Sequence, residues 1–177
     1  ISEKRDNSQM ASDDSKYLYF SGEDGEPTEA EVHFIEINAI GNSGEWQSSF
    51  PKVREGNVSA QLVRDVILDK FENKEFPDWR RNSDDVILEL ATVDGNIDLS
   101  KQEINCSLRF FWCQFEEVRF NESSVSGIVE IKNCISGIFT LDKTNVAGRV
   151  TFTSCKNNTE VTPLVINASR ALVKGLN

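Results

Sequence analysis

The most constraining feature of this 177-residue chain is a 21-residue repeat of apolar side chains. Leu99, Phe120 and Leu141 have this spacing, and four further sets of apolar residues share it. One coil of a solenoid cannot bury its own inward face, so equivalent residues must stack at roughly 4.8 Å into continuous apolar columns. The repeat therefore predicts a parallel β-solenoid. The further ladders are Ile97, Val118 and Phe139; Phe110, Ile131 and Phe152; Leu108, Val129 and Val150; and Ile104, Val125 and Val146.

Within one coil the apolar residues follow a local rhythm. Ile97 and Leu99 lie two positions apart, the strand period that places both side chains on one face and Asp98 on the other. Ile104 follows five positions later, so four five-residue units and one extra corner residue make up a coil. A helix needs a spacing of about 3.6 residues, and an antiparallel sheet has no reason to keep this register. An irregular β-sandwich remains the alternative fold.

The stretch from Cys113 to Val125 follows the rhythm without interruption. It resembles the repeats of the pentapeptide-repeat family, whose units place a small residue and then a large apolar residue inward. The resemblance covers roughly residues 86 to 155. It implies an all-β fold, a right-handed parallel β-helix of quadrilateral cross-section, with coils of about 21 residues.

Three phrases, Gly95–Ser100, Ser126–Ile131 and Ala147–Phe152, are similar to the GxLDLS repeats of uncharacterised bacterial proteins. Some of those proteins are labelled membrane-associated oxidoreductases. This chain has no GxGxxG motif, no CxxC motif and no metal-ligand spacing, so we expect no cofactor and no metal. The extra corner residue and the β-branched residues depart from the strict pentapeptide pattern. These departures concern the cross-section more than the solenoid itself.

Composition divides the chain into three parts. Residues 1–30 are polar and acidic and are expected to be largely flexible. Residues 31–85 form an N-terminal region, in which the alternation within Glu31–Ile40 predicts a strand. Residues 86–177 contain the solenoid repeats, which stop at Asn177 with no evident cap.

An amphipathic helix is predicted at about residues 59–72, before the repeats. Solenoid ends need a cap against end-to-end stacking, and we expect this helix to close the first coil. Asn57 or Ser59 is the expected N-cap. The apolar face consists of Leu62, Val63, Val66, Ile67 and Phe71.

The net charge of −10 lies almost wholly in the N-terminal half. Residues 1–85 have 19 acidic and 10 basic side chains, whereas residues 86–177 have 10 and 9. Neither half has the basic surface of a nucleic-acid-binding protein, and no apolar run reaches the roughly 18 residues that span a bilayer. We therefore expect no nucleic-acid partner and no membrane segment in this chain, and we expect a bacterial protein of this kind to be cytoplasmic.

Three of the four cysteines, Cys113, Cys134 and Cys155, form a ladder of the same 21-residue spacing. A metal or redox stack is one interpretation. We favour a structural one, because free cysteine behaves as a small buried apolar residue and the repeat requires such a residue here. A disulfide would distort the stacked alignment. Cys106, near a corner, lies outside the ladder.

Phe111 and Trp112 directly follow the inward Phe110, so at least one of them should face outward beside Arg109. An exposed aromatic pair is a candidate anchor for a protein partner. The alternative is that the N-terminal region folds back over the pair.

No catalytic constellation is evident. His33 is the only histidine and lies outside the repeats, which removes Ser-His-Asp and Cys-His arrangements from the solenoid. The expected function is a non-catalytic interaction or scaffold module that binds an unknown protein partner or self-associates through a solenoid end. One alternative, known among pentapeptide-repeat proteins, is a DNA-mimic regulator of a topoisomerase, which needs a strongly negative solenoid. Another is a polysaccharide-acting β-helix enzyme that would use Glu116, Glu117 and Glu122.

Overall fold

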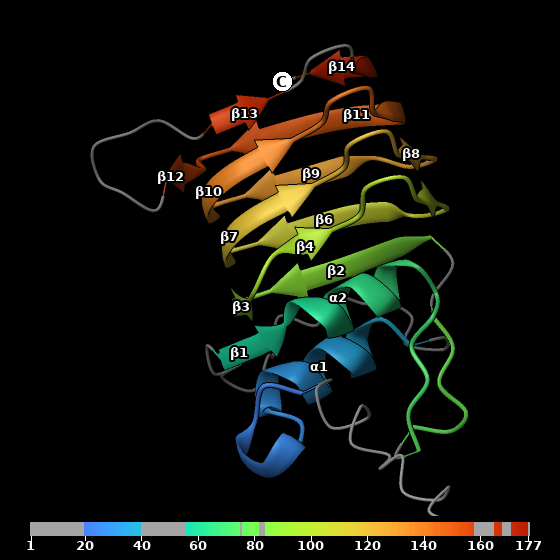
Figure 1. The fold of residues 1–177 in the computed structure, drawn as a ribbon, viewed down its shortest axis with the longest axis vertical. Helices are drawn as coiled ribbons and strands as arrows, with labels where there is room; N and C mark the ends of the chain where they lie inside the picture. The colour runs from blue at the N-terminus through green and yellow to red at the C-terminus, as the bar shows by residue number, and fades with distance from the viewer. Residues whose placement is uncertain are drawn as a thin grey trace, which may run out of the picture.

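The computed structural model describes residues 20–39, 56–74, 76–81, 84–157, 165–167 and 171–176. A helical N-terminal layer lies at one end of a stack of parallel strands, and the last strands lie at the other end (Figure 1). The helices are η2 (Glu23–Gly25, a 3-10 turn), α1 (Glu29–Ile37) and α2 (Ala60–Ile67). The strands are β1 (Gly56–Ser59), β2 (Asp85–Glu89), β3 (Ala91–Asp94), β4 (Ile97–Asp98), β5 (Glu103–Ile104), β6 (Ser107–Phe111), β7 (Gln114–Arg119), β8 (Ser124–Val125), β9 (Val129–Lys132), β10 (Ile135–Thr140), β11 (Asn145–Thr153), β12 (Lys156–Asn157), β13 (Val165–Asn167) and β14 (Leu172–Leu176).

The named strands form two sheets of seven, and all their pairings are parallel. The first sheet contains β1, β3, β4, β7, β10, β12 and β13, and the second contains the other seven strands. Four short strands, β3 to β6, make up the first coil. In later coils they merge, because β7 pairs with both β3 and β4, and β11 pairs with both β8 and β9. The predicted parallel β-solenoid is confirmed, and its four segments per coil fall into two sheets.

The strand register confirms the 21-residue ladders. Ile97 pairs with Val118 and Val118 with Phe139, and three of the other ladders are paired in the same way. The ladder side chains are at most 1% exposed, apart from the partly buried Phe152. The spacing is longer by one position between the paired Val86 and Leu108, and it is longer again where β10 pairs with β13. The stack therefore accepts extra residues without losing its inward columns.

Two corners join the sheets, and both contain non-glycine residues in the left-handed region. Such a conformation costs roughly 1 kcal/mol or more per residue. The cost is offset because corner amides donate to the next coil, as from Trp112 N to Lys132 O at 3.0 Å. One corner, here called the cysteine corner, comprises Leu90, Trp112, Asn133 and Ser154, with φ of 53° to 55°. The other, the hydroxyl corner, comprises Lys101, Glu122 and Lys143, with φ of 52° to 59°, and is followed by Ser123 and Thr144.

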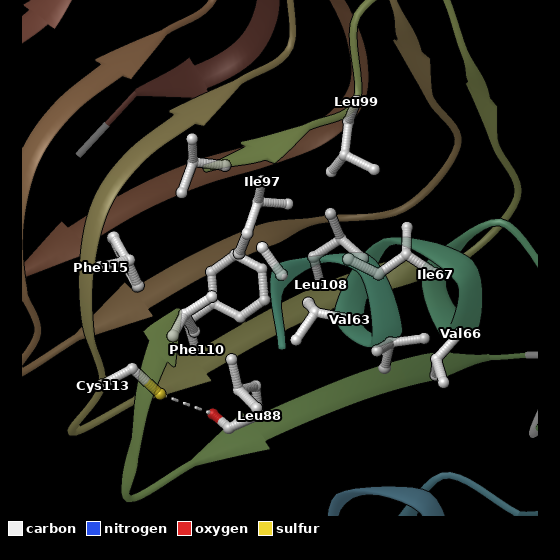
Figure 2. Close-up of a cluster of buried hydrophobic side chains, with 14 of the residues drawn as sticks. Val63, Val66, Ile67, Leu88, Ile97, Leu99, Leu108, Phe110, Cys113 and Phe115 are labelled. Atoms are coloured by element: carbon white, nitrogen blue, oxygen red, sulfur yellow. Dashed lines mark hydrogen bonds between the residues drawn. The ribbon is translucent and has the colours of Figure 1, made fainter. Parts of the chain in front are cut away.

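Helix α2 closes the apolar interior at the N-terminal end, as predicted (Figure 2). It ends at Ile67 rather than near residue 72, so the buried Phe71 lies beyond the helix. In Figure 2, Val63 and Ile67 point toward Leu108 and Leu99 of the first coil. Ser59 occupies the N-cap position, although its side chain makes no capping hydrogen bond. The helix therefore covers the apolar core at the position that another coil would otherwise occupy. The buried residues of its apolar face are Leu62, Val63, Val66 and Ile67.

The strand predicted within Glu31–Ile40 is wrong, because this segment contributes to helix α1. The buried residues Ala30, Phe34 and Asn38 follow a helical spacing of four. A capping box begins the helix: Thr28 Oγ1 accepts from Glu31 N, and the Glu31 carboxylate accepts from Thr28 N. The Thr28-x-x-Glu31 motif is the sequence feature that could have identified the helix.

At the C-terminal end of α1, a side chain forms hydrogen bonds with the unpaired backbone groups of β2, the edge strand of the second sheet. Asn38 imitates a neighbouring strand there: its Oδ1 accepts from Ile87 N at 2.8 Å, and its Nδ2 donates to Ile87 O at 2.8 Å. Asn38 Nδ2 also donates to Phe34 O at 2.7 Å. Asn38 is 1% exposed and Ile87 is half-buried, so these bonds replace water at a partly buried edge.

At the N-terminal end of α1, side chains form hydrogen bonds with the unpaired backbone groups of β1, the edge strand of the first sheet. Thr28 Oγ1 donates to Asn57 O at 2.7 Å, and the buried Glu31 carboxylate accepts from Ser59 N at 2.9 Å. Ser21 N donates to the same carboxylate. Together with Asn38, these contacts close the edges of β1 and β2 against further pairing.

Besides the end of α2, two other boundaries differ from the sequence prediction. Of the segment expected to be flexible, residues 1–19 lie outside the described residues, whereas residues 20–30 contain η2 and the start of α1. The solenoid also begins before residue 86, because β1 pairs with β3 and adds a strand to the first sheet.

Replacing Asn38 with alanine should destabilise the fold. Asn38→Ala leaves the amide and carbonyl of Ile87 without these partners at a partly buried edge, which lowers the free energy of unfolding by about 2 kcal/mol. Urea unfolding followed by circular dichroism measures the change. Asn105→Ala, at an exposed position, is the control and should change it by less than about 0.5 kcal/mol. Equal effects of the two substitutions would contradict the edge-closing role.

The apolar role of α2 gives a second stability prediction. Ile67→Ala opens a cavity between the helix and the first coil and should lower the free energy of unfolding by about 2 to 4 kcal/mol. Gln61→Ala, on the exposed side of the same helix, should cost less than about 1 kcal/mol. Urea unfolding followed by circular dichroism measures both changes. A small change in the free energy of unfolding for Ile67→Ala would show that the helix does not cover the core.

Candidate interaction surface

Three large apolar side chains are exposed near the cysteine corner. Trp112 is 51% exposed, Ile138 41% and Ile135 39%. Trp112 is the corner residue between β6 and β7, and the two isoleucines lie on β10 in the next coil. Among the described residues, the other large exposed apolar side chains are Ile166 and Leu172, on the last two described strands.

Hydrogen bonds between coils fix the backbone of this surface. Trp112 N donates to Lys132 O at 3.0 Å, and Ile135 N donates to Cys113 O at 2.8 Å. Ile135 pairs with Gln114, two residues beyond Trp112. The exposed side chains of two successive coils are therefore held beside one another by the parallel sheet.

The two aromatic residues singled out in the sequence lie in different environments. Phe111, at the end of β6, is only 7% exposed, whereas Trp112 is half exposed. Their rings are in contact, with centroids 6.2 Å apart and planes inclined by 61°. Trp112 is thus the accessible member of the pair, and Phe111 supports it from the side of the second sheet.

Arg109, the third residue of the predicted surface, belongs to an ion-pair ladder. Its Nη1 lies 2.7 Å from Glu130 Oε2 in the next coil, and its Nε lies 3.2 Å from Asp85 Oδ1 in the preceding one. All three side chains are about a third exposed, so solvent screens the pairs. Arg109 is therefore held along the outer face of the second sheet.

Sequence reasoning missed Ile135 and Ile138. The repeat specifies inward residues, and outward positions vary freely from coil to coil: Ile135 stands where the adjacent coils have Gln114 and Lys156. Ile138 directly precedes the inward Phe139, and two adjacent apolar residues in a strand cannot both face inward. That adjacency was the available signal.

The cysteine ladder is hydrogen bonded to the backbone, with Cys113 and Cys134 buried and Cys155 half-buried. Cys113 Sγ donates to Leu88 O at 3.3 Å (Figure 2), and Cys134 and Cys155 make the same contact with the preceding coil. At the hydroxyl corner, Thr144 Oγ1 donates to Phe120 O across the same interval of 24 residues that separates Cys134 from Phe110. Both corners thus hold a small donor side chain that satisfies a carbonyl of the coil below.

Burial governs the thiol chemistry. Burial raises the pKa of Cys106 to about 11, and it also raises the pKa values of Cys113 and Cys155. Thiolates are the reactive species, so these shifts make the thiols of Cys106, Cys113 and Cys155 poor nucleophiles near neutral pH. The hydrogen bond with the Cys113 side chain instead lowers the pKa of Cys134, but this thiol is 1% exposed and shielded from reagents. The ladder has the character of core structure.

The other candidate residues are dispersed. Glu117 pairs with Arg119, and Glu122 lies 3.4 Å from Lys143 Nζ at the hydroxyl corner. His33 lies on α1, with its Nε2 3.2 Å from Glu89 Oε1. Within the described ranges, no group of three or more His, Cys, Asp or Glu side chains is placed to hold a metal ion.

Comparisons of the chain with protein-family models, with curated proteins and with solved structures found no match. None of the helices in the described part of the chain is long and apolar enough to cross a membrane.

The thiol environments predict an order of alkylation. At about pH 8, iodoacetamide should modify the half-buried Cys155 first and leave Cys106 and Cys113 largely unmodified while the protein is folded. Peptide mass spectrometry at successive times gives the order, and all four cysteines should react in denaturant. Rapid modification of Cys113 in the folded protein would contradict a purely structural ladder.

Proposed function

We propose that this chain is a non-catalytic protein-interaction or scaffold module built on a pentapeptide-repeat-like solenoid. The observation that carries the proposal is the gathering of exposed Trp112, Ile135 and Ile138 at the cysteine corner and the adjoining wall. Monomeric proteins expose single apolar side chains routinely, but a group on one rigid face is typical of interaction sites.

The rigidity of this surface supports the proposal. Association loses free energy when loops and side chains must be ordered, and a backbone fixed by coil-to-coil hydrogen bonds avoids most of that loss. Tryptophan is the residue type most enriched among interface residues with large energetic contributions. Trp112 at the corner, with aliphatic residues beside it, therefore has the composition of an anchor.

The alternative functions have less support. Glu117 and Glu122, two of the three carboxylates considered for polysaccharide cleavage, are engaged with Arg119 and Lys143. The same pairs interrupt the continuous negative surface that a DNA mimic needs. Arg109, between Asp85 and Glu130, interrupts it on the second sheet.

The proposal is tested by selecting a displayed library of random peptides for binding to the chain. Enriched peptides should bind Trp112→Asn at least about tenfold more weakly, since a tryptophan anchor contributes about 2 kcal/mol or more. Asparagine occupies the equivalent corner in the next coil, at Asn133, so the substitution preserves the left-handed backbone. Fluorescence polarisation of labelled peptides measures affinity, and thermal unfolding verifies that the variant is folded.

A matched control separates this surface from the end of the solenoid. Leu172 is 71% exposed but lies on β14, and Leu172→Ala should leave the selected peptides bound with unchanged affinity. Peptides that depend on Leu172 and not on Trp112 would move the interaction site to the solenoid end. If no enriched peptide depends on Trp112, the proposal fails.

A further inference from the structure

Two lysines flank the exposed apolar residues of the cysteine corner. Lys132 ends β9 and is exposed, and its carbonyl accepts the amide hydrogen of Trp112. Lys156 begins β12, is also exposed, and pairs with Ile135 in the sheet. Trp112 and Ile135 therefore each have a lysine nearby on the following coil, whereas Ile138 pairs with Val165 there.

These lysines differ from three other cations of the solenoid walls, and they share with the exposed Lys101 and Arg149 the lack of an ion pair among the described residues. Arg109, Arg119 and Lys143 each have a carboxylate partner within 4 Å. Lys132 and Lys156 have no ion pair with any residue that the structure describes. Both side chains are exposed, as an electrostatic contact with a bound molecule requires.

The corner is locally positive in its last three turns, whereas its first turn, at Leu90, follows Glu89, and the exposed Glu116 lies on the adjoining strand β7. The stretches 111–114, 132–135 and 153–156, which turn this corner in three successive coils, contain two lysines and no acidic residue. The whole chain has 29 acidic and 19 basic residues and a net charge of −10. A local positive patch on an acidic protein is a specific electrostatic feature rather than a consequence of composition.

We infer that the cysteine corner binds an acidic segment of a protein partner, one that places an apolar side chain against Trp112 and Ile135 and carboxylates near Lys132 and Lys156. The inference rests on the proposed interaction function and adds the chemistry of the partner. Complementary charge mainly sets specificity and the rate of association, while the apolar contact provides most of the affinity. Repulsion from the distant acidic residues is screened beyond about 8 Å at physiological ionic strength.

A polypeptide fits this surface better than a nucleic acid. Nucleic-acid affinity depends on many phosphate contacts, and two lysines supply few of them. Bases also stack on aromatic side chains, and on this surface Trp112 is aromatic whereas Ile135 and Ile138 are aliphatic, so successive bases have no row of rings to stack on. A peptide with an apolar side chain flanked by carboxylates can contact both the exposed apolar residues and the lysines of the corner.

The test uses the peptides that a random displayed library enriches on the wild-type chain. Those that depend on Trp112 should have a net negative charge. They should bind the double variant Lys132→Glu, Lys156→Glu at least about fivefold more weakly, and wild type more weakly as salt rises from about 0.05 to 0.3 M. Lys101→Glu is the matched control, because Glu122 occupies the equivalent corner place in the next coil; it should leave affinity unchanged.

The outcomes distinguish this inference from the proposed function. Peptides that require Trp112 but are neutral or basic, or that bind the double variant as well as wild type, overturn the acidic-partner inference and leave the interaction function standing. If no enriched peptide requires Trp112, both the acidic-partner inference and the proposed interaction function are contradicted. A single-stranded oligonucleotide that binds wild type tightly and loses affinity in the double variant would identify the corner as a phosphate-binding surface and would also overturn the inference.

Discussion

The structure depends on keeping successive coils in register. A slip of one residue in a strand exchanges inward and outward side chains and would expose every apolar ladder at once. The corner hydrogen bonds oppose such a slip, since they fix where each coil turns. Extra residues are confined to places that leave the pairing intact. The additional residue of the first coil falls between Thr92 and Ile97, where Gly95 has φ of +94°, and those of the last described coil fall between β12 and β13.

A stack of this kind raises two separate problems at its N-terminal end, and two helices solve them. The apolar interior is covered by α2, which presents side chains of the same kind as a further coil. A helix cannot pair with a strand edge, because its own backbone groups are already bonded within it. The edges are therefore satisfied by side chains of α1. Asn38 is suited to this task because its amide, like a peptide group, offers a donor and an acceptor together.

The sequence predicts the parts of this protein that the stacking constrains. Inward positions such as Ile97 and Val118 repeat because each one packs on its equivalent, so the ladders, their register and the covering helix are predictable. Helix α1 was not recognised because its alternating apolar residues imitate a strand, and its role depends on strands distant in the sequence. The exposure of the outward aromatic residues was also unpredictable. Phe111 follows an inward residue, which indicates that its side chain points outward, but its exposure of only 7% depends on tertiary contacts. Outward residues such as Ile135 obey no repeat at all.

Because stacking does not constrain the outward positions, the residues found there are the ones that can indicate function. Stability decides the inward residues and favours Asn or Gly at left-handed corners, so Asn133 is the expected occupant of such a place. Trp112 occupies the equivalent place with its ring half exposed, and it gains little from burial to offset the conformational cost. Backbone preference does not account for a tryptophan there, and its contact with the Phe111 ring still leaves half of the side chain exposed. The proposed interaction function supplies a reason, because contact of the exposed ring with another molecule would offset the conformational cost of this corner.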